Sequence, residues 1–322
     1  MIILIQKTRS KNNYFLKLEA LARRLPPTHK SYKLVQTKLA QLEAGEWGEE
    51  SVAMNLARFT PDFPINLFHD ILLKSYSFFQ IDHLILTKHY ALIIESKNLK
   101  FQIEITRNPD QLIQYDELGN SKVMDSPLQQ LEKNCEWMRG WLLNKGIDLP
   151  VFGIFAVSNV NCKIVTKQEE PTIVRASFLQ KKILELPRST EFIDENTLAK
   201  LKKSILNEHM EFDQHNFLKN FDVDVKELLP GMWCDVCKKL TVSKIGFKFM
   251  CTCGNENPSS FMQAVNDYFL LMKNEMSNKE CRTFLKIESA KVTYRKLQQS
   301  GLQIQGRGRN TLYLNKRSPA KN

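Results

Sequence analysis

The stretches Phe78-Phe79-Gln80-Ile81-Asp82 and Tyr90-Ala91-Leu92-Ile93-Ile94-Glu95-Ser96-Lys97 decide the fold of this chain. Each is an apolar run bounded by polar residues, the usual signature of a strand in a covered sheet. Thr87-Lys88-His89 lies between them and predicts the tip of a hairpin. In a strand, residues two apart point to the same face, so Glu95 and Lys97 should project together. The sequence therefore predicts neighbouring strands whose polar ends present two acids and a lysine.

These acids and the lysine allow two interpretations. Two carboxylates can hold a divalent metal ion, and an ammonium beside them can orient a water and offset charge on a phosphate. Charged residues at strand ends can also simply face solvent, because clustered acids are only probabilistic pointers to a site. Two further residues favour the catalytic interpretation. Glu49 precedes an expected helix over 51–59, and Gln129 lies in the first turn of an expected helix that runs to Trp141.

The start of that second helix is well specified, because Ser126 suits the N-cap and Pro127 suits the first helical position. Taken in order, the motifs resemble the nuclease-related domain (NERD) family, a branch of the PD-(D/E)xK phosphodiesterase superfamily. The residues that carry the resemblance are Gly45-x-x-Gly48-Glu49, Asp82, Ile94-Glu95-Ser96-Lys97-Asn98 and Pro127-x-Gln129, within residues 41–155.

The resemblance implies an α/β fold with a restriction-endonuclease-like mixed sheet flanked by helices. It also implies that Asp82 and Glu95 are ligands of a catalytic Mg²⁺ or Mn²⁺ and that Lys97 is catalytic. Glu49 and Gln129 would complete the site as accessory residues. The activity implied is the hydrolysis of phosphodiester bonds.

The charge distribution favours a nucleic-acid partner. The chain of 322 residues carries a net charge of +11, and its length fits two or three domains. Residues 1–40 have a net charge of +8 and residues 273–322 one of +9, which leaves −6 for the rest. Basic ends around an acidic metal site suit a polyanion held by flanking segments. Basic tails that only aid solubility or bind any anion are the alternative.

Cysteine usage and hydropathy bear on compartment. The chain has seven cysteines, and an odd number argues against a disulfide framework. The opening run Met1-Ile2-Ile3-Leu4-Ile5 is too short for a signal-peptide core, and no run approaches eighteen apolar residues. We therefore expect a reduced, cytoplasmic protein without a membrane partner. Cys135, Cys162 and Cys281 are expected to be free buried thiols.

The remaining cysteines form a second motif, Cys234-Asp235-Val236-Cys237 followed by Cys251-Thr252-Cys253-Gly254. Two cysteine pairs, each in a tight turn, can place four thiolates around a structural Zn²⁺. The intervening residues, from Val242 to Phe249, would form the strands of a zinc ribbon. A redox function is the competing explanation, but a redox motif needs one Cys-x-x-Cys near a βαβ unit.

Beyond the ribbon, the sequence predicts helices over 261–276, after Ser277 and over 290–299, followed by a hairpin around Gly306-Arg307-Gly308-Arg309. This order outlines a winged helix. Lys291 and Arg295 lie on one face of the expected recognition helix, and Arg307 and Arg309 at the tip of the wing, where they would contact phosphates. A small helical packing domain with a solvated basic face is the alternative.

The chain is thus expected to comprise a basic lead-in (1–40), a catalytic α/β domain (41–208), a linker (209–229), a zinc ribbon (230–258) and a helical, winged-helix-like nucleic-acid-binding domain (259–322). Two functions of different class remain. The first is a metal-dependent DNA nuclease, and the second is a DNA-binding protein with a degenerate nuclease domain. RNA is kept as an alternative substrate, because the sequence does not reveal whether any residue contacts the 2′-hydroxyl that distinguishes RNA from DNA.

Overall fold

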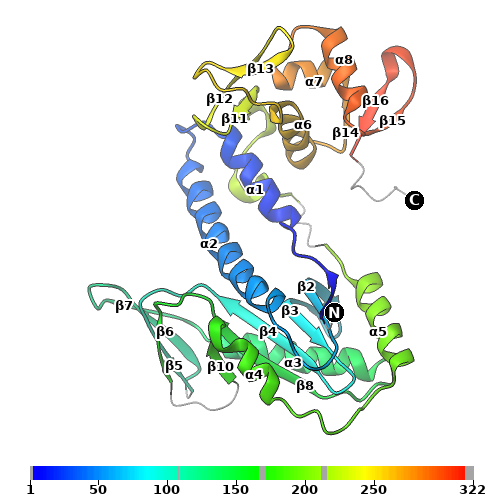
Figure 1. Cartoon of the computed structure of the whole chain (residues 1–322). Coiled ribbons are helices and arrows are strands. Elements are labelled where there is room, and N and C mark those ends of the chain that lie inside the picture. The colour runs from blue at the N-terminus through cyan, green and yellow to red at the C-terminus, as the bar shows by residue number, and fades with distance from the viewer. Residues whose placement is uncertain (1–2, 108, 167–171, 212–215, 316–322) are drawn as a thin grey trace. The chain divides into compact units, whose positions relative to one another are not determined.

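The computed structural model describes residues 3–107, 109–166, 172–211 and 216–315. The chain divides into two compact units (Figure 1). The sheet unit consists of Met1–Ser10 and Leu42–Glu211, and the cysteine unit of Lys11–Gln41 and Phe212–Asn322. The expected lead-in of residues 1–40 is therefore shared between the units, because its first strand pairs within the sheet of the sheet unit.

The sheet unit is built on a six-stranded mixed sheet, in agreement with the predicted fold class. Its strands run in the order β1-β2-β3-β4-β8-β10. β2, β3 and β4 pair antiparallel, whereas β1 is parallel to β2, and β4, β8 and β10 are mutually parallel. The bounds are β1 Ile3–Lys7, β2 Ile65–Lys74, β3 Phe78–Leu86, β4 Ala91–Lys97, β8 Val151–Val157 and β10 Thr172–Arg175.

Helices cover both faces of this sheet (Figure 1). α3 (Pro127–Leu143) and α5 (Glu195–Glu208) share a core with alternate strand residues such as Ile93. α2 (Tyr32–Ala57) and α4 (Leu179–Glu185), the latter preceded by the short helix η1 (Ala176–Phe178), share a second core with residues such as Leu92. A four-stranded sheet, β7-β6-β5-β9, lies beside the first; its strands are Ser121–Asp125, Gln111–Tyr115, Gln102–Thr106 and Lys163–Thr166.

Several helix ends follow from local sequence. The Ser126 side chain accepts a hydrogen bond from the backbone N–H of Leu128, and Pro127 occupies the first turn, as expected for the start of α3. The expected helix over 51–59 is wrong at its start. α2 is continuous through Gly45 and Gly48, so the glycines lie inside the helix instead of before it. Tertiary packing of α2 overrides the weak helix propensity of glycine.

The cysteine unit begins with α1 (Asn13–Arg24), and its core joins the residues around the four cysteines to the C-terminal helices. Arg24 is fully buried, and its Nε lies 2.9 Å from Oδ2 of the buried Asp267. The Arg23 Nη2 is 2.7 Å from Oδ1 of the same carboxylate. A buried carboxylate between two guanidinium groups therefore links α1 to α6 (Ser260–Leu271).

The rest of the cysteine unit consists of short elements. η2 (Lys219–Phe221) and η3 (Val225–Glu227) precede the antiparallel sheet β11-β12-β13, formed by Met232–Cys234, Lys239–Ile245 and Lys248–Cys251. After α6 come β14 (Glu275–Ser277), α7 (Asn278–Leu285), α8 (Ala290–Gln299), β15 (Gln303–Gln305), η4 (Gly308–Asn310) and β16 (Leu312–Leu314). The last three strands form a sheet in the order β14-β16-β15.

The C-terminal helices match their predicted positions in part. α7 is capped by Ser277 and α8 by Ser289, as the sequence predicts. The expected helix over 261–276 is too long, because α6 ends at Leu271 and Met276 instead pairs with Tyr313 in the terminal sheet. The winged-helix interpretation stays a prediction. No helix in the described part of the chain has the length and apolar character needed to cross a bilayer.

Candidate active site and metal centre

Asp82 lies at the centre of β3 and not at its end, because the apolar run continues through Leu86. Its side chain is buried, and Oδ2 accepts hydrogen bonds from the backbone N–H of Ser96 at 2.9 Å and from the Ser96 hydroxyl at 3.2 Å. Ser96 follows Glu95 on the neighbouring strand β4. The structure thus joins Asp82 to the Glu95-Ser96-Lys97 motif.

Glu95 and Lys97 share one face of β4, as their spacing predicts. Lys97 Nζ lies 3.0 Å from Glu95 Oε1, in an ion pair whose carboxylate is 1% exposed and whose lysine side chain is 42% exposed. Glu95 Oε2 is buried and has no hydrogen-bond partner among the described residues. A buried carboxylate oxygen without a partner is costly, so this atom is suited to a cation.

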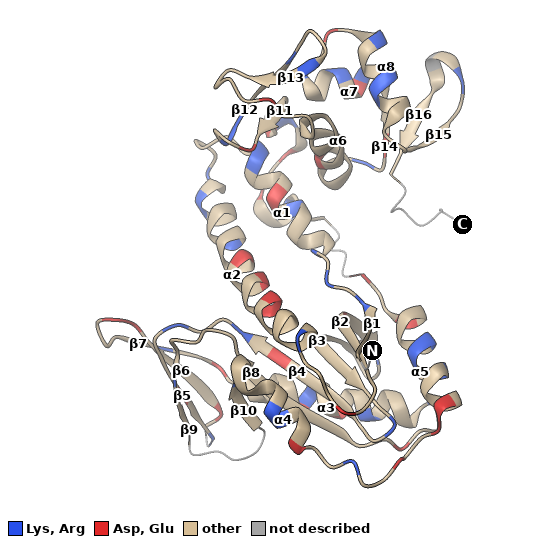
Figure 2. Ribbon diagram, in the orientation of Figure 1, with Lys and Arg blue, Asp and Glu red and all other residues tan. Residues whose placement is uncertain are grey.

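Glu49 belongs to the same group of charges. It lies on α2, and its Oε2 is 2.5 Å from Nη1 of Arg9. The nearly buried Arg9 side chain also pairs with Glu46, Glu50 and Asp70, at distances from 2.8 to 3.5 Å. Figure 2 shows several acidic residues along α2. Glu49 is therefore held by an arginine from the segment after β1.

The electrostatics of this group favour a bound cation. Burial raises the pKa of Asp82 to about 7, and repulsion from Glu95 adds to this rise. Burial raises the pKa of Glu49 to about 8, with repulsion from Asp82 added. Burial also raises the pKa of Glu95. Burial alone would lower the pKa of Lys97, but attraction to Glu95, Asp82 and Glu49 outweighs burial, so the pKa of Lys97 is raised. These acids repel one another, and a cation would relieve that repulsion.

Gln129 and Lys97 line one cavity of about 540 Å³ beside α3. Its walls also include the aromatic residues Phe78, Phe79 and Trp137. Gln129 is exposed, and its side-chain amide donates to Asp110 Oδ2 at 3.2 Å. The structure therefore brings Gln129 to the same cavity as Lys97, while its amide is engaged with Asp110.

Sequence reasoning did not identify Arg9, Asp70, His69 or His83. His69 and His83 are buried on β2 and β3 with their Nδ1 atoms 2.7 Å apart. Burial lowers the pKa of His69 to about 4 and that of His83 well below its usual value. Both imidazoles are therefore neutral at pH 7, and one Nδ1–H donates to the other ring. The two rings meet because the register of β2 and β3 places His69 opposite His83.

Gly48 explains part of the motif before Glu49. A Cβ at Gly48 would lie 2.9 Å from Asn98 Cβ and 2.9 Å from Ser158 Oγ. The Ser158 backbone N–H and hydroxyl both donate to the carbonyl of Lys97. The glycine thus lets α2 approach the end of β4, where Glu95 and Lys97 lie.

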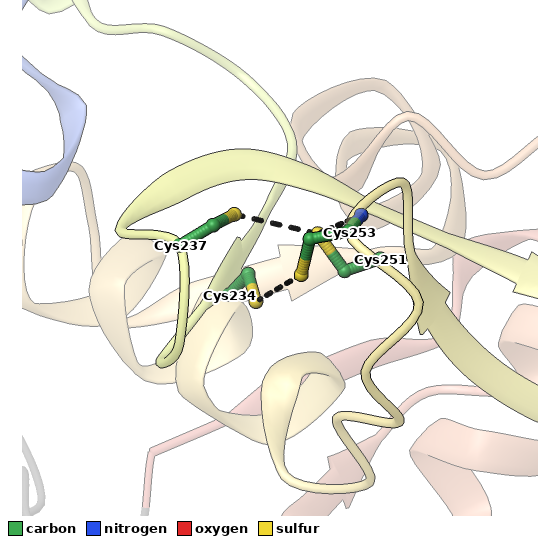
Figure 3. Close-up of side chains that lie close together, drawn as sticks. All are labelled: Cys234, Cys237, Cys251 and Cys253. Carbon is green, nitrogen blue, oxygen red and sulfur yellow. Dashed lines mark hydrogen bonds between the residues drawn. The ribbon is translucent and has the colours of Figure 1, made fainter.

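The four cysteines of the second motif converge in the cysteine unit (Figure 3). Their sulfur atoms all lie within 4.8 Å of one another, with Cys234 and Cys253 3.8 Å apart and Cys237 and Cys251 3.5 Å apart. Four sulfurs at Zn–S bonds of about 2.3 Å in a tetrahedron would be about 3.8 Å apart. The four thiols can therefore hold one tetrahedral metal ion such as zinc.

Two details of this cluster suit thiolate ligands. A hydrogen bond from the backbone N–H of Cys253 lowers the pKa of Cys251 to about 6, with a further contribution from the Thr241 hydroxyl. Thr241 would also lower the pKa of Cys237, but burial and the neighbouring thiols outweigh this effect, so the pKa of Cys237 is instead raised to about 11. Among the described residues, this cluster is the one group of three or more Cys, His, Asp or Glu side chains close enough to share a metal ion. The carboxylates of Glu49, Asp82 and Glu95 are less tightly grouped. All seven cysteines are free, and Cys135, Cys162 and Cys281 are buried as expected.

The predicted nucleic-acid contacts are exposed where their side chains are described. Lys291 and Arg295 lie on the exposed face of α8, and Arg307 precedes η4. The backbone of Arg309 belongs to η4, but its side chain lies outside the described residues. The structure leaves the side chains of Lys291, Arg295 and Arg307 accessible to a ligand.

Comparison with family models relates a segment of the chain to a known domain. The model of the nuclease-related domain (NERD) matches residues 44–158, which include β2, β3, β4, α3 and β8. Comparisons with curated proteins and with solved structures gave no significant match. The matched segment begins just before Gly45 and contains Glu49, Asp82, Glu95, Lys97 and Gln129. Residues 44–158 of this chain therefore match the nuclease-related domain family.

Proposed function

We propose that the protein is a metal-dependent nuclease that hydrolyses phosphodiester bonds in DNA. Asp82 and Glu95 would hold one Mg²⁺ or Mn²⁺, with Lys97 at the reacting phosphate. The supporting observation is the unpartnered Oε2 of the buried Glu95, beside a second buried acid and a lysine. Oxygen ligands of this kind suit Mg²⁺ and Mn²⁺, so the residues present fit the ion that the domain family suggests.

The metal would polarise a phosphoryl oxygen and supply an activated water. The chain's own residues would do the rest. Ser96 fixes the orientation of the Asp82 carboxylate through two hydrogen bonds. Lys97 is partly exposed and lines the cavity, so its ammonium can reach a phosphate while Glu95 Oε1 holds it in place. That ammonium would offset negative charge developing on the phosphate.

Glu49 and Gln129 would have supporting roles in this proposal. Glu49 repels the other acids and is itself paired with Arg9, so it can adjust the charge balance of the site. Gln129 is placed to contact substrate in the cavity it shares with Lys97. The cysteine unit would bind a structural Zn²⁺ and hold DNA through the basic residues of α8 and the final hairpin.

Cleavage assays test this function. Purified protein is incubated with labelled single-stranded, duplex and branched DNA, and with matched RNA, in Mg²⁺, Mn²⁺ or EDTA. We expect cleavage of DNA with either metal and none in EDTA. Asp82→Asn and Lys97→Gln should each reduce the rate roughly a hundredfold or more, because each removes a charge used in the transition state.

Asp148→Asn and Lys203→Gln are matched controls. Both residues are exposed in the sheet unit, and the two substitutions remove the same charges as Asp82→Asn and Lys97→Gln. They should cleave like the wild type. Cleavage by Asp82→Asn and Lys97→Gln at the wild-type rate would refute the assignment. Metal-independent binding without cleavage by the wild type would instead favour a degenerate, DNA-binding domain.

A further inference from the structure

A second depression lies at the β10 edge of the main sheet. It has a volume of about 360 Å³ and is lined by Arg175, Phe178, Lys181 and Lys182 above the apolar residues Ile164 and Ile173. We call it the β10 depression. Among the residues that the structure describes, its lining contains three basic side chains and no acidic one. Phe178 is 55% exposed, so one face of its ring is open to a ligand.

The basic groups are largely free for a ligand. Among the described residues, Arg175 and Lys181 have no carboxylate within ion-pair distance, while Lys182 pairs with Glu185 at 2.7 Å. Arg175 Nη2 donates to the carbonyl of Cys162 at 3.2 Å, which fixes the guanidinium with other N–H groups remaining. A fixed guanidinium beside a free ammonium is a suitable site for a phosphate.

The register of the sheet relates this depression to the candidate active site. Lys97 on β4 pairs with Val157 on β8, and Val157 pairs with Arg175 on β10. In-register residues of parallel strands point to the same face, so Lys97 and Arg175 stand on one face of the sheet. Two strand spacings separate them, about 10 Å between their backbones. Val157, between them, is fully buried in a core that also contains Ile103 and Cys162, so Lys97 and Arg175 stand on either side of a covered stretch of that face.

Phe178 supplies a different kind of contact. Phe178 is the last residue of η1, the short helix that begins directly after Arg175. Its ring is exposed beside the basic groups of the depression. Stacking of a base on an exposed aromatic ring, next to cations that bind the backbone, is how proteins hold single-stranded nucleic acids. Duplex bases are stacked within the helix and offer no face to Phe178. The chemistry of the depression therefore fits an unpaired nucleotide.

We propose that the β10 depression binds one nucleotide of a single-stranded nucleic acid. Arg175 and Lys181 contact the phosphate, and Phe178 stacks on the base. The proposal rests on the nuclease function for the identity of the strand, but the binding site itself is testable without cleavage. Figure 2 shows the basic residues on α4.

The test uses the full-length protein without Mg²⁺, Mn²⁺ or chelator, so that no metal-dependent cleavage occurs and the cysteine cluster keeps any bound zinc. Binding of a fluorescein-labelled single strand, as DNA and as RNA, is followed by anisotropy between about 50 and 200 mM salt. Arg175→Gln and Lys181→Gln should each weaken binding and reduce the slope of log K against log salt by about 0.7. Phe178→Ala should weaken binding about fivefold or more with an unchanged slope, since a stacked ring carries no charge.

Two further variants separate binding from structural damage. Arg175→Lys keeps the charge and should retain the wild-type slope. Lys203→Gln removes an exposed charge on α5, outside the depression, and should leave affinity and slope unchanged. The proposal would be overturned if the Arg175→Gln and Lys181→Gln variants had the same affinity and salt slope as Lys203→Gln. It would also be overturned if the wild type did not bind the single strand.

The outcome is separable from that of the cleavage assay. Loss of affinity in the Arg175 and Lys181 variants, in a protein that cleaves nothing, would support the binding site and refute the nuclease. Cleavage by a wild type whose binding is insensitive to all three substitutions would support the nuclease and refute the site. Comparison of the DNA and RNA strands shows which sugar the depression accepts.

Discussion

Gly45 and Gly48 provide a paired test of how α2 packs against the candidate site. Both lie inside the same helix, where replacement of glycine by alanine normally stabilises by about 0.5–1 kcal/mol. At Gly45 a new Cβ meets nothing within 4 Å, so Gly45→Ala should show this gain. At Gly48 the Cβ would lie 2.9 Å from Asn98 Cβ and 3.2 Å from the Asn98 backbone nitrogen.

The contact at Gly48 cannot be relieved by rotation of a flexible side-chain end. The Asn98 atoms belong to, or adjoin, the backbone, and Ser158 Oγ donates to the carbonyl of Lys97. Overpacking of this kind costs about 1–3 kcal/mol. After the gain in helix propensity, Gly48→Ala should be neutral to destabilising by about 2 kcal/mol. The gap between the two variants should therefore be about 2 kcal/mol.

Thermal unfolding followed by far-ultraviolet circular dichroism measures this gap. A difference of about 2 kcal/mol corresponds to roughly 4–8 °C in the melting of a unit of this size. Gly45→Ala should melt above the wild type and Gly48→Ala at or below it. Because Gly48 adjoins the end of β4, Gly48→Ala should also slow any cleavage, whereas Gly45→Ala should not. Melting of Gly48→Ala at or above Gly45→Ala would refute the reasoning.

Three further predictions concern the cysteine unit. Asp267→Asn should destabilise it by about 3–5 kcal/mol in urea unfolding, because two guanidinium groups lose their buried partner; an unchanged midpoint would contradict this. Metal analysis of chelator-free protein should find one zinc per chain, and Cys251→Ser should lose it; a zinc-free wild type would reject the cluster as a zinc site. Arg295→Gln should reduce the salt slope of duplex-DNA binding by about 0.9, and an unchanged slope would argue that α8 does not contact phosphates.

The parts of the fold that follow from local patterns could be predicted from the sequence. The apolar runs before Asp82 and Glu95 are indeed neighbouring strands, and Ser126-Pro127 does begin a helix. These features depend on alternation and capping within a few residues. The start of α2 could not be predicted in this way, because the packing that admits Gly48 involves Asn98 and Ser158, far along the chain.

The candidate site shows the same division. Spacing within β4 predicted that Glu95 and Lys97 meet, and the structure places them 3.0 Å apart. Arg9 could not be predicted, because it precedes the matched nuclease-related segment and reaches Glu49 only when β1 pairs with β2. The buried histidine pair depends on the register of β2 and β3, which the sequence alone does not specify.

The division of the chain between the two units has a consequence for synthesis on the ribosome. α1 packs its buried residues, including Leu18 and Leu21, into the unit that the last third of the chain completes. The ion pair between Arg24 and Asp267 joins residues 243 positions apart. At about 5–20 residues per second, roughly 12–50 s pass between the emergence of these two partners. During that interval the apolar face of α1 and the guanidinium of Arg24 lack the residues that bury them in the folded protein. Residues 44–158 emerge from the ribosome in the same interval. The cysteine unit therefore cannot complete its core until the end of synthesis, because its first helix waits for partners more than two hundred residues away.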